Sequence, residues 1–125
     1  MANETKPLFR PGHEVTVLTT GAVTGSTFVG VSATRDATTG LIKVNTATAA
    51  AKAFGVATAD IASGAKGSVL REGITFVTAG GSITAGAQVE VGSGGKAVAL
   101  ASGVPVGTAL ETGSSDNPVL VALDL

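Results

Sequence analysis

The sequence predicts an all-β fold, and three observations support this prediction. Short runs rich in Val, Ile and Thr recur along the 125 residues, and turns that contain Gly separate them. The runs follow one another at intervals of roughly 8 to 14 residues, which is typical of a sandwich or barrel. The chain has 18 Gly, four Phe and neither Trp nor Tyr, so its core must be built from small side chains.

Ten runs are expected to be strands, and the turns around them place each one in order. The first alternates polar and apolar residues, and the second and third follow turns at Gly25 and Thr39-Gly40. The fourth, fifth and sixth lie between loops of small residues, whereas the seventh and eighth flank the hairpin signal Gly92-Ser93-Gly94-Gly95-Lys96. The last two finish the chain. The expected strands are residues 14–19, 28–33, 41–45, 53–57, 67–71, 74–78, 88–91, 97–100, 105–110 and 119–123.

Two features leave alternatives open. Residues 46–53 (TATAAAKA) contain enough Ala for a turn or two of helix, and we expect a loop with helical character there. The segments 54–57 and 69–71 resemble 106–109 and 119–121, at offsets of 52 and 50 residues. This similarity indicates either a duplicated hairpin or chance resemblance in a chain rich in Gly, Ala and Val.

The first twelve residues are expected to form an extended N-terminal arm, followed by one β domain over residues 13–125. Pro7 and Pro11 disfavour helix and push the residues before them toward extended geometry. Leu8 and Phe9 are large apolar residues in this otherwise polar segment. They either pack on the domain's own core or dock on a neighbouring subunit.

The charge pattern excludes some partners. The formal net charge is −1, charged residues make up 14% of the chain, and the eight Lys and Arg are scattered. Nucleic acid is therefore not expected as a partner, since phosphate binding needs clustered cations. No apolar run is long enough to cross a membrane, and residues 1–10 do not resemble a signal peptide, so synthesis in the cytoplasm is expected. The low charge predicts that other protein covers part of the surface.

The residues for catalysis or for holding a cofactor are few, and we expect no enzyme, metal site or cofactor. His13 is the only histidine and Cys is absent, which disfavours both a catalytic triad and a zinc site. A paired-carboxylate hydrolase would need aromatic platforms that a chain without Trp and Tyr lacks. Lys96 is followed by a β-like run rather than a helix, so Gly92–Lys96 is interpreted as a hairpin and not as a phosphate loop.

Landmarks along nearly the whole chain resemble the capsid cement, or head decoration, family of tailed bacteriophages. The first is the start of the chain, Met1–Glu4 and Pro7–Gly12, followed by Val15–Val17. Each landmark is simple in composition, and their order carries the resemblance. The others are 23–29, 53–57, 69–73, 83–87, 89–91, 95–98 and 106–109.

The resemblance implies a structural virion protein on the outer surface of the head, with a small β-barrel or β-tulip-like domain. Such proteins clamp neighbouring major capsid subunits, and many form trimers, so the expected partners are the major capsid protein and further copies of the chain. Extended arms dock by strand addition. We therefore expect the arm to be the capsid-docking site, with Leu8 and Phe9 as anchors and Lys6 and Arg10 facing acidic surface. The inferred docking residues are Lys6, Pro7, Leu8, Phe9, Arg10 and Pro11.

Two rival interpretations remain at this point. One is a different virion part, such as a β domain associated with the tail or a fibre. The other is a β module that binds carbohydrate or another ligand.

Overall fold

The computed structural model describes residues 13–125, and within this range the chain is almost entirely β, so the predicted fold class is confirmed. The predicted arm of residues 1–12 lies outside the described residues, and the division into arm and domain stays a prediction. The elements are β1 (Glu14–Thr19), β2 (Phe28–Ala33), β3 (Ile42–Thr46), β4 (Gly55–Ala57), β5 (Lys66–Leu70), β6 (Ile74–Thr78), β7 (Gln88–Val91), the short 3-10 turn η1 (Ser93–Gly95), β8 (Ala97–Ala99), β9 (Gly107–Ala109) and β10 (Pro118–Leu123).

The predicted strands all exist, and the ambiguous stretch of residues 46–53 contains no helix. Thr46 ends β3, and the remaining residues form the loop between β3 and β4. Ala50 in this loop has φ of 65°, a left-handed conformation that a helix cannot contain. Ala47 and Ala53 are buried, so packing rather than helix propensity decides the path of the loop.

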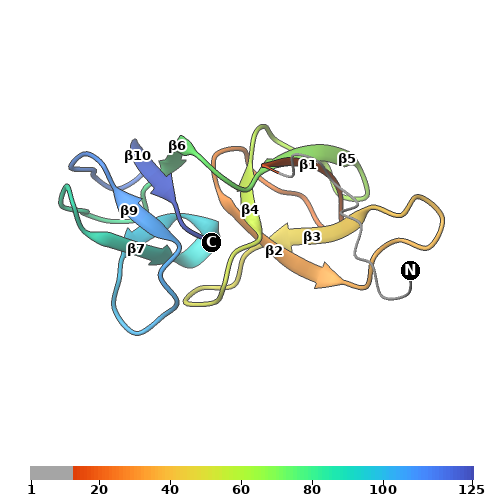
Figure 1. The fold of residues 1–125 in the computed structure, drawn as a ribbon, viewed down its shortest axis with the longest axis horizontal. Coiled ribbons are helices and arrows are strands. Elements are labelled where there is room, and N and C mark those ends of the chain that lie inside the picture. Colours follow the sequence, from red (N-terminus) through yellow and green to blue (C-terminus); the bar gives the residue numbers. More distant parts are fainter. Residues whose placement is uncertain (1–12) are drawn as a thin grey trace, which may run out of the picture.

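The strands form two five-stranded sheets side by side, with the C-terminus between them (Figure 1). The first half, residues 13–71, is a closed barrel in the order β1-β3-β2-β4-β5. The second half, residues 73–125, is a sheet in the order β6-β10-β9-β7-β8. No helix among residues 13–125 is long and apolar enough to cross a bilayer.

The second half repeats the strand pairing of the first half. The pair Val29 and Gly55 of β2 and β4 corresponds to Val89 and Gly107 of β7 and β9. A backbone hydrogen bond outside the strands also repeats: Phe54 N donates to Val29 O at 2.7 Å, and Val106 N donates to Val89 O at 2.9 Å. The similarity in sequence is therefore a structural repeat of five strands rather than of one hairpin.

The register gives the offset between equivalent residues. It is 60 for the first two strands of each half, 53 for the third and 52 for the last two, so the loop before the third strand is seven residues shorter in the second half. Residues 54–57 and 106–109 are equivalent, as the sequence indicated. The second offset of 50 was wrong, since Val69 aligns with Val121.

The two halves differ in how their sheets close. Three residues of β1 pair with β3, whereas β6 and β8 meet at the single bridge between Ala79 and Ala97. The backbone beside Phe28 of the first half lies against this opening, since Ser26 O accepts a hydrogen bond from Thr78 N at 2.9 Å. A Cβ placed on Gly95 would lie 2.6 Å from Phe28 O. The opening is thus covered by the first half.

The hydrophobic core of the second half extends into the first half. The first-half cluster consists of residues of that half alone, all of them Val, Ala or Ile. The second cluster includes four first-half residues, Phe28, Ala47, Ala53 and Val56, and the Phe28 side chain is fully buried. Burying such a side chain stabilises the fold by about 1.5–3 kcal/mol. The second half therefore depends on the first for part of its core.

A buried carboxylate also lies where the halves meet. Glu90 on β7 is 5% exposed, and its Oε1 accepts a hydrogen bond from Ala101 N at 2.7 Å, while Oε2 has no hydrogen-bond partner among residues 13–125. Its equivalent in the first half is Gly30. Gly103 leaves space for this carboxylate, because a Cβ there would overlap with it and with Ala50. Glu90 therefore fixes the β8–β9 loop, and Val104 N of this loop donates to Ala50 O of the loop between β3 and β4 at 3.2 Å.

Candidate docking surfaces

The sequence-predicted docking residues, Lys6 to Pro11, all lie outside the described residues, so their contacts stay a prediction. The structure does describe the point from which they extend. His13 O accepts a hydrogen bond from Arg71 N at 2.7 Å, next to the linker between the halves. The described part of the chain therefore begins at the junction, where His13 pairs with the residue that follows β5.

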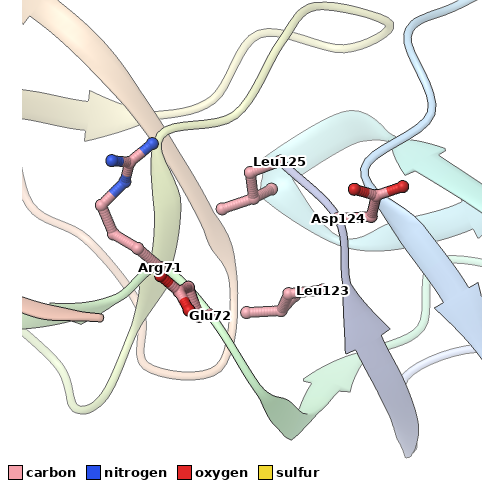
Figure 2. A pocket seen from close by; sticks show the side chains of 5 residues that line it. All are labelled: Arg71, Glu72, Leu123, Asp124 and Leu125. Atoms are coloured by element: carbon pink, nitrogen blue, oxygen red, sulfur yellow. The ribbon is translucent and has the colours of Figure 1, made fainter. Parts of the chain in front are cut away.

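An open pocket of about 320 Å³ lies at this junction (Figure 2). Leu123 and Leu125 of the second half point toward Arg71 and Glu72, whereas the Asp124 carboxylate lies farther from Arg71. The lining combines one cation, two carboxylates and two leucines. Such a surface can hold an extended chain, but it presents no activated nucleophile.

Arg71 is fixed by the first half. Its Nε donates to Phe54 O at 3.0 Å, and its guanidinium carbon lies 4.4 Å from the centre of the Phe54 ring. A cation over an aromatic face is stabilised by the ring quadrupole. Arg71 thus lines both this pocket and a second depression, which is also lined by Val31, Lys52 and Phe54.

The side chains that could perform catalysis do not form a constellation. Glu14 accepts a hydrogen bond from Ser68 Oγ at 2.6 Å, but both are exposed strand residues and no His lies between them. Within residues 13–125 the His13 imidazole makes no hydrogen bond, and no group of three His, Cys, Asp or Glu is placed to hold a metal ion.

Apolar side chains gather on the outer side of β6 and β10 and directly after β9, and we call this set the apolar face: Ile74, Phe76, Leu110 and Leu120. Ile74 is 62% exposed, Phe76 51% and Leu110 45%. Phe76 pairs directly with Leu120, and Leu110 N donates to Leu120 O at 2.8 Å, so the three side chains form one row across the sheet. Ile74 begins the next row, where it pairs with Ala122.

The equivalent row of the first half is polar. Thr16 pairs with Ser68, and Thr58 N donates to Ser68 O at 3.1 Å. These three residues occupy the positions of Phe76, Leu120 and Leu110 on a backbone with the same pairing. The same fold therefore carries a polar row in one half and an apolar row in the other.

Sequence reasoning missed the apolar face, although a signal for it was present. The run 74–78 (ITFVT) places Ile74 and Phe76 on one face of a strand and Val77 on the other. A strand with large apolar residues on both faces is expected to be covered on both sides. In this structure the inner side is buried and the outer side is open.

A model of the phage cement protein family matches residues 9–123, which is most of the chain. The chain belongs to the phage cement protein family. The cement protein is therefore a structural component of a phage virion, associated with the head.

A solved structure shares the fold. It is the N base of the head fiber gp8.5 of bacteriophage phi29, with a TM-score of 0.74 and 23% sequence identity over 89% of this chain and 92% of that chain. At this identity the likeness concerns the fold alone. No curated protein matches the sequence.

Proposed function

We propose that this cement protein decorates the outer surface of the phage head and clamps neighbouring major capsid subunits together. Its role in this proposal is mechanical, with no catalytic activity and no cofactor. The observation that carries the proposal is the family match over residues 9–123. The low charge, the exposed apolar face and the lack of a catalytic constellation among the described residues all support a role in packing against protein.

The arm supplies the first contact with the shell. Residues Lys6 to Pro11 would extend from the junction at His13 and add a strand to capsid-protein elements, with Leu8 and Phe9 as anchors. Extended residues span at most about 3.3–3.6 Å each, so twelve residues reach roughly 40 Å.

Repetition on the lattice supplies the affinity. Each copy needs only modest contacts, because a second contact on the same lattice becomes intramolecular and adds avidity. We propose that the copies associate as homotrimers on the outer surface of the head, after synthesis in the host cytoplasm. Neither nucleic acid nor membrane takes part in this assembly.

A binding experiment tests the function directly. Purified protein is mixed with expanded, undecorated heads, sedimented, and the heads are then melted by calorimetry. We expect saturable binding at micromolar concentration and a higher melting temperature of the heads. Heads that gain neither protein nor thermal stability would contradict the proposal, as would labelled protein that electron microscopy places on tails.

A second experiment tests the arm. We expect deletion of residues 2–11 to abolish head binding while the circular dichroism and melting of the isolated protein stay close to those of the full chain. The double substitution Leu8→Ser with Phe9→Ser should weaken binding similarly, whereas Asn3→Ser should have no effect. Full occupancy by the deletion variant would show that the arm is not the clamp.

A further inference from the structure

We propose that the apolar face of the second half is a second docking surface, and that it binds a surface segment of the capsid protein in which apolar side chains are flanked by Lys or Arg. This inference rests on the proposed function, because it takes the capsid shell as the partner. Beyond the proposed function, the inference names a second part of this protein that contacts the shell. It also names the chemistry of the capsid segment that this part binds.

The first argument is that the fold does not need these apolar residues. The first half has Thr16, Ser68 and Thr58 at the positions of Phe76, Leu120 and Leu110, with the same strand order and register. The inner sides of both sheets are packed with buried Val and Ala, whichever residues lie outside. The apolar row therefore serves something outside the chain.

The second argument is the arrangement of the exposed side chains. Ile74, Phe76 and Leu110 are between 45% and 62% exposed. Ile74 and Phe76 lie on β6, Leu110 directly follows β9, and Leu120 of the intervening strand β10 lies between Phe76 and Leu110. Single exposed apolar residues are normal, but a contiguous patch marks an interaction site. Leu120 is at the middle of the row, and Phe76 lies on the edge strand β6, where an exposed aromatic ring can act as an anchor in a protein interface.

The third argument is charge, and it decides the kind of partner. Residues 73–125 carry four carboxylates and one Lys, whereas residues 13–71 carry five Lys or Arg and three carboxylates. The one Lys of the second half, Lys96, is paired with Asp116 at 2.7 Å. Glu111 lies at one end of the apolar row, where it accepts a hydrogen bond from Leu120 N at 3.0 Å.

Carboxylates also border the other end of the apolar face. Glu72 precedes Ile74 by two residues, and Asp124 follows its partner Ala122 by two. Between residues 13 and 125 these two carboxylates and Glu111 form no ion pair. A second copy docked face to face would bring these like charges together, which disfavours self-association. A segment with Lys or Arg beside its apolar residues would complement them.

The first experiment transplants the first-half residues onto the second half. The triple variant Phe76→Thr, Leu110→Thr and Leu120→Ser takes exactly the residue types that the repeat carries at these positions, so we expect it to fold. Its affinity for undecorated heads should fall at least tenfold. The matched control is Val31→Thr, which removes an exposed valine (63% exposed) from the first half and should leave head binding unchanged.

The second experiment keeps the native surface and identifies the partner. A photo-crosslinking phenylalanine analogue is placed at position 76 or, as the matched control, at position 16, and each protein is irradiated on heads. We expect position 76 to cross-link to a capsid peptide that contains Lys or Arg close to the attachment point, and position 16 to cross-link to none. This measurement stands even if the triple variant fails to fold.

The outcomes separate this inference from the proposed function. If the unmodified protein does not bind heads, the proposed function fails. If it binds but the folded triple variant binds equally well, or if position 76 links only to another copy or to residues 1–12, the function stands and this inference is overturned. A capsid peptide without Lys or Arg would overturn the assigned charge of the partner.

Discussion

The two halves of the cement protein share one hydrogen-bonded frame and differ in what they present to their surroundings. Val29 and Val89 pair with Gly55 and Gly107 in the same way. Outside this frame the first half has a polar row and a closed barrel, whereas the second half has the apolar face and an opening. The comparison shows that strand pairing is set by backbone and inner side chains, while the outer row is free to acquire a function.

The same comparison shows that the contact between the two halves is asymmetric. Phe28 fits the core of the second half, which has an opening between β6 and β8. Its equivalent in the second half, Gln88, is exposed and polar, and the first half has no opening to receive it. The contact therefore joins two different surfaces, one from each half. It cannot recur along a series of such units, because the closed first half offers no opening for the residue equivalent to Phe28.

The largest expected effect concerns this contact. The substitution Phe28→Ala should lower the free energy of unfolding by about 3–5 kcal/mol, because it empties a fully buried site in the shared core. The equivalent change Gln88→Ala should cost no more than about 0.5 kcal/mol, since that side chain is exposed. Urea denaturation measures both, and equal costs would show that the halves do not share a core.

Next in size is the glycine that both halves require. A Cβ placed on Gly55 would lie 2.7 Å from Leu70 O, and one on Gly107 would lie 2.5 Å from Ala122 O. We expect Gly55→Ala and Gly107→Ala each to cost about 1–3 kcal/mol through overpacking.

Gly30 supplies the control for these two variants, because the nearest atom to a Cβ there is 3.7 Å away and Gly30→Ala should be nearly neutral. Chemical denaturation of the three variants checks the result. A large loss of stability at only one of the two equivalent positions would show that the halves share their geometry but not the energetic cost of a side chain at this position.

A smaller effect is expected in the turn before the second strand of each half. Ser26 has φ of 60° and its equivalent Gly86 has φ of 87°, and both N–H groups donate to equivalent carbonyls, Ala57 O and Ala109 O, at 2.8 Å. Left-handed geometry costs most residues roughly 1–2 kcal/mol but costs Gly little. Ser26→Gly should therefore stabilise the protein by about 0.5–1 kcal/mol.

The reciprocal change, Gly86→Ser, should destabilise by a similar amount, and no atom lies within 4 Å of a Cβ there to add a clash. Thermal melting of both variants gives the two signs. Changes of the same sign would mean that the side chain of Ser26, rather than its backbone, determines the stability of this turn.

The smallest effect is expected in the loop that only the first half has at full length. Hydrogen bonds from the Thr39 hydroxyl and N–H, both at 2.7 Å, together with Lys43 at 3.7 Å, hold the pKa of Asp36 below its usual value. A carboxyl with a lowered folded-state pKa contributes stability above its unfolded pKa, and this contribution disappears as the pH falls through the folded value.

We expect Asp36→Asn to lower the melting temperature slightly near neutral pH and to have a smaller effect at about pH 2, because the contribution fades as the pH falls from the ordinary Asp pKa through the lowered folded-state value. Calorimetry at the two pH values checks this. Asp60, whose Oδ1 accepts a hydrogen bond from Gly25 N at 2.8 Å, provides a second exposed carboxylate for comparison. A deficit of equal size at both pH values would exclude ionisation of Asp36 as its cause.

Local pattern predicted much of the fold. The strands of residues 14–19, 28–33, 74–78 and 88–91 were placed at their observed ends, because alternation and flanking turns are local properties. The hairpin at Gly92–Lys96 formed as expected, with Gly92 N donating to Lys96 O at 2.7 Å. Other strand ends moved by one or more residues, since pairing partners determine where a strand stops.

Less of the candidate site than of the fold could be predicted from the sequence. The predicted arm stays a prediction, and the apolar face was missed because its members come from β6, from β10 and from the residue directly after β9. Leu110 and Leu120 become neighbours of Phe76 only through the pairing of β6, β10 and β9. The repeat was also underestimated, since only a few of its residues, such as Gly55 and Gly107, are identical between halves.

The sequence by itself determined that this protein is all-β, built on small side chains, and a member of a family that packs on phage heads, because composition, turn spacing and the order of landmarks are properties of the linear chain. Only the tertiary structure decided which strands pair, that the pairing repeats, and that Phe28 belongs to the core of the other half. The physical reason is that strand pairing joins residues far apart in sequence, and the burial of a side chain depends on those partners.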